Sequence, residues 1–196
     1  MWVVARVREF DADEAVRRAM ELFWEGGYEA TSLRDLTDAL GIGSGSLYAA
    51  FGSKEGLFQA ALARYRQEQA QPVLDTLAAE ADVRAALRQI LAGVVALSVS
   101  DAHLRGCLVV NSATERIPHD VDTAAAVRGI LGSIEGAIED ALRRAQQRGD
   151  LDPDKDPAAL AGFFVTFMNG LRVAAKTDPD ERTLTQRVQV ALTVLD

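Results

Sequence analysis

The stretch from Thr31 to Lys54, TSLRDLTDALGIGSGSLYAAFGSK, limits the possible folds of this chain more than any other segment. Thr31 and Ser32 offer hydroxyl N-caps, and the aspartate three residues after Ser32 completes a capping-box pattern. Leucines then recur at helical spacing until Gly41, which is suited to end a helix in the left-handed conformation. A second helix is expected over residues 43–51. Two short helices joined by a glycine-containing turn are typical of a helix-turn-helix, whose second helix enters the DNA major groove.

The remaining chain predicts further helices and no strand, since no segment alternates apolar and polar residues with a period of two. The expected helices cover residues 11–25, 53 to about 72, 82–98, 106–116, 120 or 122 to 148, 156–176 and 181–194. Pro72 is expected to kink or end its helix. The predicted fold is all-α, with a helix-turn-helix DNA-binding domain over residues 1–55 and an effector-binding and dimerisation domain over residues 56–196.

Composition points to a soluble globular protein, with 48% apolar and 26% charged residues. No apolar run reaches the roughly 18 residues that span a bilayer, the best being residues 90–99, and the first ten residues lack the apolar core of a signal peptide. We therefore expect a cytoplasmic protein with no membrane partner.

The chain shows no sign of catalytic or metal chemistry. Serine, histidine and acidic residues do not cluster at a useful spacing, and no phosphate-binding loop occurs. Cys107 is the sole cysteine, so no intrachain disulfide can form. A metal site from His103, Cys107, Glu115 and His119 is disfavoured because a glycine and a proline break the helical spacing between them. We predict no enzyme activity, no metal and no cofactor.

Net charge allows two interpretations. The chain carries −8, and residues 1–55 hold six basic and ten acidic side chains, a net charge of −4. Since phosphate attraction supplies much of the affinity for DNA, the acidic head favours a protein that binds no nucleic acid. Helix N-termini and backbone amides, however, hold phosphates without basic side chains. We retain the DNA-binding interpretation and expect binding that is weak at high salt.

About fifty residues resemble the TetR family of one-component transcriptional repressors. The resemblance rests on Leu22, Phe23, Gly27, Tyr28, Thr31, Ser32, Leu40, Gly41, Ile42, Ser46, Leu47, Tyr48, Phe51, Lys54, Glu55, Leu57 and Phe58. It implies a homodimer that binds a near-palindromic DNA operator and releases it when an effector binds.

The predicted DNA-binding residues lie in and beside the two short helices. Arg34 projects opposite the leucines and is shaped for a bidentate contact with guanine. The resemblance implies phosphate contacts for Tyr48 and Lys54, whose alternatives are packing within the head and a solvated surface lysine. The complete predicted set is Thr31, Ser32, Arg34, Ser44, Gly45, Ser46, Tyr48 and Lys54.

The last two helices carry wide apolar stripes, and the resemblance implies that they form a four-helix interface with a second chain. The predicted interface residues are Phe164, Met168, Leu171, Leu184, Val188 and Leu192. The alternative is that these helices only close the core of one chain.

The segment from Arg105 to Glu115, RGCLVVNSATE, resembles a motif in one branch of the family, in which some members sense electrophiles or oxidants through the cysteine. Alternatively, Cys107 is a small buried hydrophobic residue. The predicted effector and sensor residues are Cys107, Asn111, Phe163 and Phe167.

The function expected from the sequence is a homodimeric repressor that is released from its operator by a small effector or by modification of Cys107. The alternative is a helical dimer that binds small molecules and no DNA. The sequence does not identify the effector.

Overall fold

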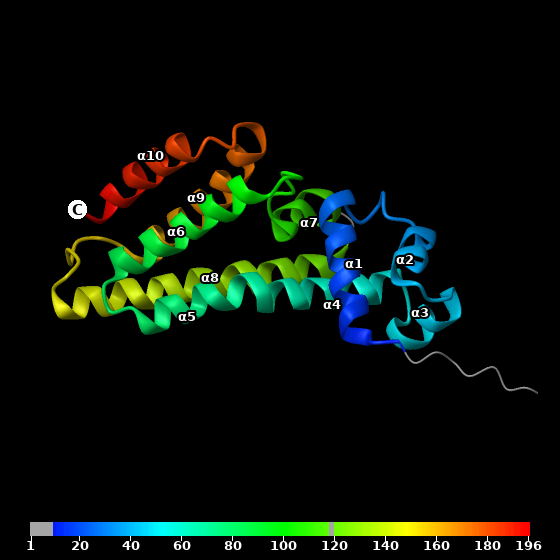
Figure 1. The fold of residues 1–196 in the computed structure, drawn as a ribbon. Coiled ribbons are helices and arrows are strands. Elements are labelled where there is room, and N and C mark those ends of the chain that lie inside the picture. Colours follow the sequence, from blue (N-terminus) through cyan, green and yellow to red (C-terminus); the bar gives the residue numbers. More distant parts are fainter. Residues whose placement is uncertain (1–9, 118–119) are drawn as a thin grey trace, which may run out of the picture. The chain divides into compact units, whose positions relative to one another are not determined.

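The computed structural model describes residues 10–117 and 120–196, which form helices and no strand (Figure 1). The predicted all-α fold is confirmed. The chain divides into two compact units, one ending at Arg64 and the other running from Tyr65 to Asp196, which we call the head and the body. The functional division at residue 55 remains a prediction.

The head contains α1 (Ala12–Gly26), α2 (Leu33–Leu40), α3 (Ser44–Phe51) and most of α4 (Lys54–Tyr65). Several of these helices begin or end at the capping residues that the sequence predicts. Ser32 and Asp35 form a capping box at the start of α2, and Gly41 ends α2 with φ 68°. At the start of α4, the Ser53 hydroxyl accepts a hydrogen bond from the Gly56 amide at 2.9 Å. Short helices are marginal alone, so these caps supplement the packing that holds α2 and α3 in place.

An aromatic cluster fills the centre of the head. The Phe58 ring meets the rings of Phe23 and Tyr28 edge to face, with centroid distances of 5.0 and 4.9 Å. Phe23 and Phe58 are each 1% exposed. Complete burial of such a side chain contributes about 1.5–3 kcal/mol, so the cluster fixes α1 to α4. Leu36 and Leu47 are fully buried and attach α2 and α3 to this core.

The helix that begins with α4 does not end at Pro72. It widens into a π turn, η1 (Arg66–Ala70), and continues as α5 (Gln71–Ala79). Within this turn the Gln71 amide donates to the carbonyl of Arg66. Proline has no amide hydrogen, and its ring clashes with the carbonyl four residues earlier in a regular helix. The wider turn before Pro72 relieves that clash, so the helix continues.

The body continues with α6 (Val83–Ser100), α7 (Leu108–Arg116), α8 (Val121–Arg148), α9 (Pro157–Thr177), α10 (Glu181–Leu192) and the 3-10 turn η2 (Thr193–Leu195). Aspartates 82, 120, 156 and 180 cap α6, α8, α9 and α10, and Gly149 ends α8 with φ 81°. Asp120 also pairs with the buried Arg116, whose Nε atom donates to Thr123 at 3.3 Å. Hydrogen bonding, first from the Thr123 amide, lowers the pKa of Asp120 to about 2.

In the body, α8 packs along α9 on one side and against α5 and α7 on others, while α10 lies on α6 and α9 (Figure 1). By length and composition alone, α6 and α9 would be long and apolar enough to cross a membrane. By this measure the expectation that no apolar run is long enough does not hold, because two basic residues in each helix interrupt the apolar runs without lowering the mean hydropathy enough. Both helices pack against other helices of the body.

Replacement of Gly56 tests the junction between α3 and α4. A Cβ atom at this position would lie 2.0 Å from the carbonyl oxygen of Phe51, and the backbone offers no flexible group to move aside. We expect Gly56→Ala to lower the unfolding free energy of the head by about 1–3 kcal/mol or more. Trp24 lies in α1 of the head, so its fluorescence during urea unfolding reports on the head.

Gly45→Ala is the matched control, because nothing lies within 4 Å of the added Cβ atom. It should raise stability by about 0.5–1 kcal/mol through helix propensity. Equal effects of the two substitutions would contradict the steric explanation.

The capping box makes a prediction about pH. Hydrogen bonds from the Ser32 hydroxyl and then the Ser32 amide lower the pKa of Asp35. A carboxylate with a lowered folded-state pKa stabilises the fold above its unfolded-state pKa, and this contribution is lost as the pH falls. We expect Ser32→Ala to raise the pKa of Asp35 toward its ordinary value, measured by carboxyl-carbon NMR titration. Thr37→Ala is the control, since the Thr37 hydroxyl donates to the carbonyl of Arg34 and not to Asp35. An equal rise in the pKa of Asp35 in this variant would contradict the prediction.

Candidate functional site

The second helix of the helix-turn-helix presents a surface of small side chains. Ser44, Gly45, Ala49 and Ala50 are exposed, and Tyr48 is 50% exposed beside them. Leu47 points into the head, and no side chain caps the first turn of α3. A helix with such little bulk on its outer face can approach another surface closely.

Two of the predicted DNA-binding hydroxyls have structural partners. Thr31 is 5% exposed and donates to the carbonyl of Gly27 at 2.6 Å, so it braces the turn between α1 and α2. Ser32 is exposed, and its hydroxyl donates to the Asp35 carboxylate at 2.6 Å. Ser46 is half-buried. Of the predicted DNA-binding residues on α3, Ser44, Gly45 and Tyr48 are therefore the exposed ones.

The two predicted cations occupy different settings. The side chain of Arg34 is 88% exposed, and its Nε atom lies 3.5 Å from Asp38 one helical turn later. Lys54, at the first position of α4, is half-buried with its Nζ atom 4.0 Å from the centre of the Tyr28 ring. This cation-π contact joins Lys54 to the aromatic cluster of the head.

Local acids pair with several basic side chains of the head. Glu14 bonds both Arg17 and Arg18 at 2.7 Å, and these bonds lower the pKa of Glu14 to about 2. Arg64 bonds Asp13 at 2.8 Å. Glu14 and Asp13 thus offset the charge of three arginines of the head.

In the body, Cys107 is 3% exposed at the start of α7 and contacts two polar side chains. The Tyr65 hydroxyl donates to its Sγ atom at 3.4 Å, and Nη1 of Arg172 lies 3.8 Å from the same sulfur. Burial raises the pKa of Tyr65 well above its ordinary value, so its hydroxyl remains a donor. Cys107 is buried, as the alternative interpretation expected, yet two polar side chains contact its sulfur.

The structure does not bring the four predicted effector residues together. Asn111 donates to the carbonyl of Arg105 at 2.9 Å and so braces the loop that leads to Cys107. Phe163 is 39% exposed and stacks on Phe167 with a centroid distance of 6.0 Å. Nine positions separate Phe163 from Arg172, which is about two and a half helical turns, so the two side chains lie on opposite faces of α9. Phe163 and Phe167 therefore belong to the outer face of α9.

The six residues predicted to form a dimer interface are all buried within the single chain: Phe164, Met168, Leu171, Leu184, Val188 and Leu192 are each between 0 and 3% exposed. They supply the core between α9, α10 and the rest of the body, so the apolar stripe on which they were chosen packs against this chain's own helices. The surface on these helices that remains available to a second chain must consist of other residues.

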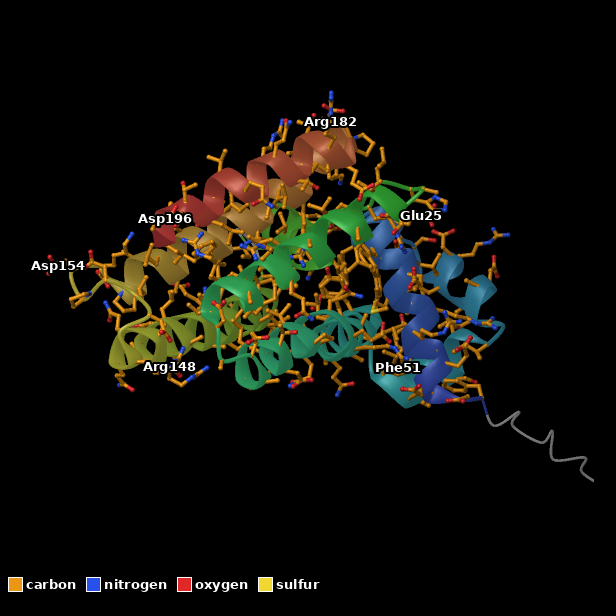
Figure 2. The ribbon with its side chains drawn as sticks, turned by 60° about the vertical axis from the view of Figure 1, so that its left-hand side comes forward. Glu25, Phe51, Arg148, Asp154, Arg182 and Asp196 are labelled. Carbon is orange, nitrogen blue, oxygen red and sulfur yellow. The ribbon has the colours of Figure 1, made fainter. Side chains whose placement is uncertain are left out.

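The outer face of α9 carries no charged side chain. It consists of Ala159, Gly162, Phe163, Thr166, Phe167, Gly170, Val173 and Ala174, all exposed or half-buried. Val173 is 50% exposed, and on α10 Val190 is 70% exposed. Figure 2 shows Arg182, near the start of α10, directed away from the body. An uncharged face with small residues one turn apart suits close packing against another helix.

Sequence reasoning missed Tyr65 and Arg172 as polar neighbours of Cys107. Tyr65 is the last residue of α4 and Arg172 lies on α9, and 42 and 65 positions separate them from the cysteine. No local pattern in the sequence signals such contacts. Within residues 10–117 and 120–196, no group of histidine, cysteine, aspartate and glutamate side chains could hold a metal ion; His119 lies outside the described residues.

Two family profiles match the chain. The profile for bacterial regulatory proteins of the tetR family matches residues 15–61, which include α2 and α3. The profile for the tetracyclin repressor-like C-terminal domain matches residues 83–191, more than half of the chain.

Individual relatives agree with the profiles. The uncharacterized HTH-type transcriptional regulator YezE of Bacillus subtilis (strain 168) is 36% identical over 98% of this chain and 100% of its own length. The HTH-type transcriptional repressor ComR of Escherichia coli (strain K12) is 34% identical over 97% of this chain and 90% of its own.

Among solved structures, a cysteine mutant of the TetR family regulator CifR, complexed with 26-base-pair operator DNA, superposes with a TM-score of 0.89. It is 38% identical and covers 98% of this chain and 100% of its own. These relatives are named as transcriptional regulators and not as enzymes. With a helix-turn-helix in its head and matches over both units, the chain belongs to the TetR family of bacterial transcriptional regulators.

Proposed function

We propose that this protein is a cytoplasmic, homodimeric repressor that binds a near-palindromic DNA operator through α3. The observation that carries the proposal is the exposed face of α3. This helix is the second of a helix-turn-helix whose first helix, α2, begins with a capping box. CifR, which shares its fold over nearly the whole chain, is complexed with operator DNA. A two-fold dimer places two such helices in successive major grooves, about 34–36 Å apart.

Arg34, Tyr48, Ser44 and Lys54 are the side chains that we assign to the operator. Arg34 is exposed, and an exposed ion pair such as that with Asp38 is worth less than about 1 kcal/mol, so the guanidinium can exchange its partner for a guanine. Tyr48 and Lys54 would contact phosphates. The alanines of α3 offer methyl contacts to thymine, and DNA shape supplies further specificity.

The body supports the second half of the proposal, release by a small effector or by modification of Cys107. Its sulfur is held between the Tyr65 hydroxyl and the Arg172 guanidinium, so any added group would disturb both contacts. Asn111, on α7, supports this site by its hydrogen bond to the carbonyl of Arg105 in the preceding loop. Phe163 and Phe167 are reassigned from the effector site to the dimer surface, with Val173 and Val190, because they lie on the outer face.

Operator binding is tested by selecting bound sequences from a random duplex library at low salt, followed by a salt titration of the selected site. A two-fold symmetric site with steep salt dependence is expected. Arg34→Ala should weaken binding by about 5- to 150-fold, and Tyr48→Phe by about 3- to 10-fold, because each removes a contact to DNA.

Arg143→Ala is the matched control for Arg34→Ala. Arg143 also pairs with an acidic residue four positions away, Glu139, but on α8 of the body. Its affinity should equal that of the wild type. If a folded dimer, freed of any bound ligand, enriches no duplex, the alternative holds: a helical dimer that binds small molecules without DNA, as the acidic head would favour.

The dimer surface makes a separate prediction. Val173→Glu would place two like charges near the two-fold axis in a desolvated interface, and we expect at least a 100-fold rise in the dimer dissociation constant, measured by analytical ultracentrifugation. Leu97→Glu is the control, since Leu97 is 58% exposed on α6. If both variants remain dimers, the outer face of α9 is not the interface.

A further inference from the structure

Two consecutive residues at the end of α4 form side-chain hydrogen bonds in different units of the protein, the first in the head and the second in the body. Nη1 of Arg64 donates to the Asp13 carboxylate at 2.8 Å and to the Asp13 carbonyl at 3.2 Å, both within the head. The next residue, Tyr65, is 4% exposed and donates to Cys107 at 3.4 Å, within the body. The boundary between the compact units falls between these two residues.

The helix immediately after Tyr65 is not regular. The π turn Arg66–Ala70 closes one residue later than an α turn does. If such a turn rewinds to α, the preceding helix rotates by about 100° and shifts by about 1.5 Å relative to the following one. The π turn next to Tyr65 can therefore absorb a change in the side-chain bonds at the end of α4.

We propose that Tyr65 is the positioning residue through which the state of Cys107 changes operator affinity, and that Arg64 passes the change to α1. The inference rests on the proposed repressor function. A substituent on the sulfur competes for the space of the Tyr65 hydroxyl, because both groups are buried. Displacement of the Tyr65 ring moves the last turn of α4, which carries Arg64 and its two bonds to Asp13 at the start of α1.

Methyl methanethiosulfonate is a suitable probe, because it adds only a methylthio group. The thiolate of Cys107 attacks the sulfenyl sulfur, a new sulfur-sulfur bond forms, the bond to the sulfonyl sulfur breaks, and methanesulfinate leaves with the electron pair; the thiol proton goes to solvent. Dithiothreitol reverses the step. Since Cys107 is the sole cysteine, the intact mass of the protein reports its modification completely.

The experiment measures the dissociation constant for the selected operator, by fluorescence anisotropy, before and after complete methylthiolation. In the wild type we expect about a tenfold or greater loss of affinity that dithiothreitol restores. Tyr65→Phe leaves room for the added group where the hydroxyl was, so its ratio of modified to unmodified dissociation constants should fall to about threefold or less. Arg64→Met should lower the ratio similarly while Tyr65 and Cys107 remain in place.

Tyr28→Phe is the matched control: it removes a phenolic hydroxyl in the head and should keep the full ratio, whatever its effect on affinity itself. Cys107→Ser should show no response. Thermal midpoints are recorded for every variant, because a merely structural role of Tyr65 would change the midpoint and leave the ratio intact.

The outcomes separate the two proposals. A wild-type protein that binds no duplex overturns the repressor function and this inference with it. A wild-type protein that binds its operator but does not respond to methylthiolation, or never gains the group, overturns the role of Cys107 and the inference, while operator binding stands. An undiminished ratio in Tyr65→Phe overturns the inference alone, and an undiminished ratio in Arg64→Met overturns the part assigned to Arg64.

Discussion

The edge-to-face packing of Phe58 on Phe23 and Tyr28 is the interaction on which the head depends. It joins α1, the turn that leads to α2, and α4, and the Lys54 side chain lies over the outer partner of the cluster. The eight-residue α3 begins with small residues and has no side-chain cap, so it would not be stable alone. Because buried apolar residues hold it in place, its outer face is free to carry the small side chains that a close approach to DNA requires.

The electrostatics of the head follow from this arrangement. Two of its acidic residues, Glu14 and Asp13, are bonded to arginines of α1 and α4, so their charges are locally offset. The pair between Arg34 and Asp38 is almost fully exposed, and such pairs exchange partners at little cost in free energy. In the proposed repressor, a head with this charge would attract DNA only weakly without regard to sequence, so its affinity would come from fitted contacts. Binding and specificity are then linked more closely than in a strongly basic protein.

In the body, the two faces of α9 have different roles. The inner face supplies core residues such as Phe164 and Met168, and at one edge it brings Arg172 to the sulfur of Cys107. The outer face is uncharged and is available to a second chain. One rigid helix therefore connects the surroundings of the thiol with the proposed dimer surface. Buried hydrogen bonds to the thiol are sensitive to small changes, because a displaced polar group in the interior must find another partner.

The sequence alone determined the features that rest on local interactions. These features are the capping box of Ser32, the left-handed Gly41 and the capping aspartates. Each is a hydrogen bond or a dihedral preference within a few residues, so the local sequence predicts the helix ends and the helix-turn-helix. Only the tertiary structure decided which apolar stripe faces the chain's own core, because periodicity reveals a face and not what covers it; Leu184 and Val188 were assigned to a partner for that reason and are buried. Likewise, the bond between Tyr65 and Cys107 joins residues 42 positions apart, and such contacts arise only when packing brings distant helices together.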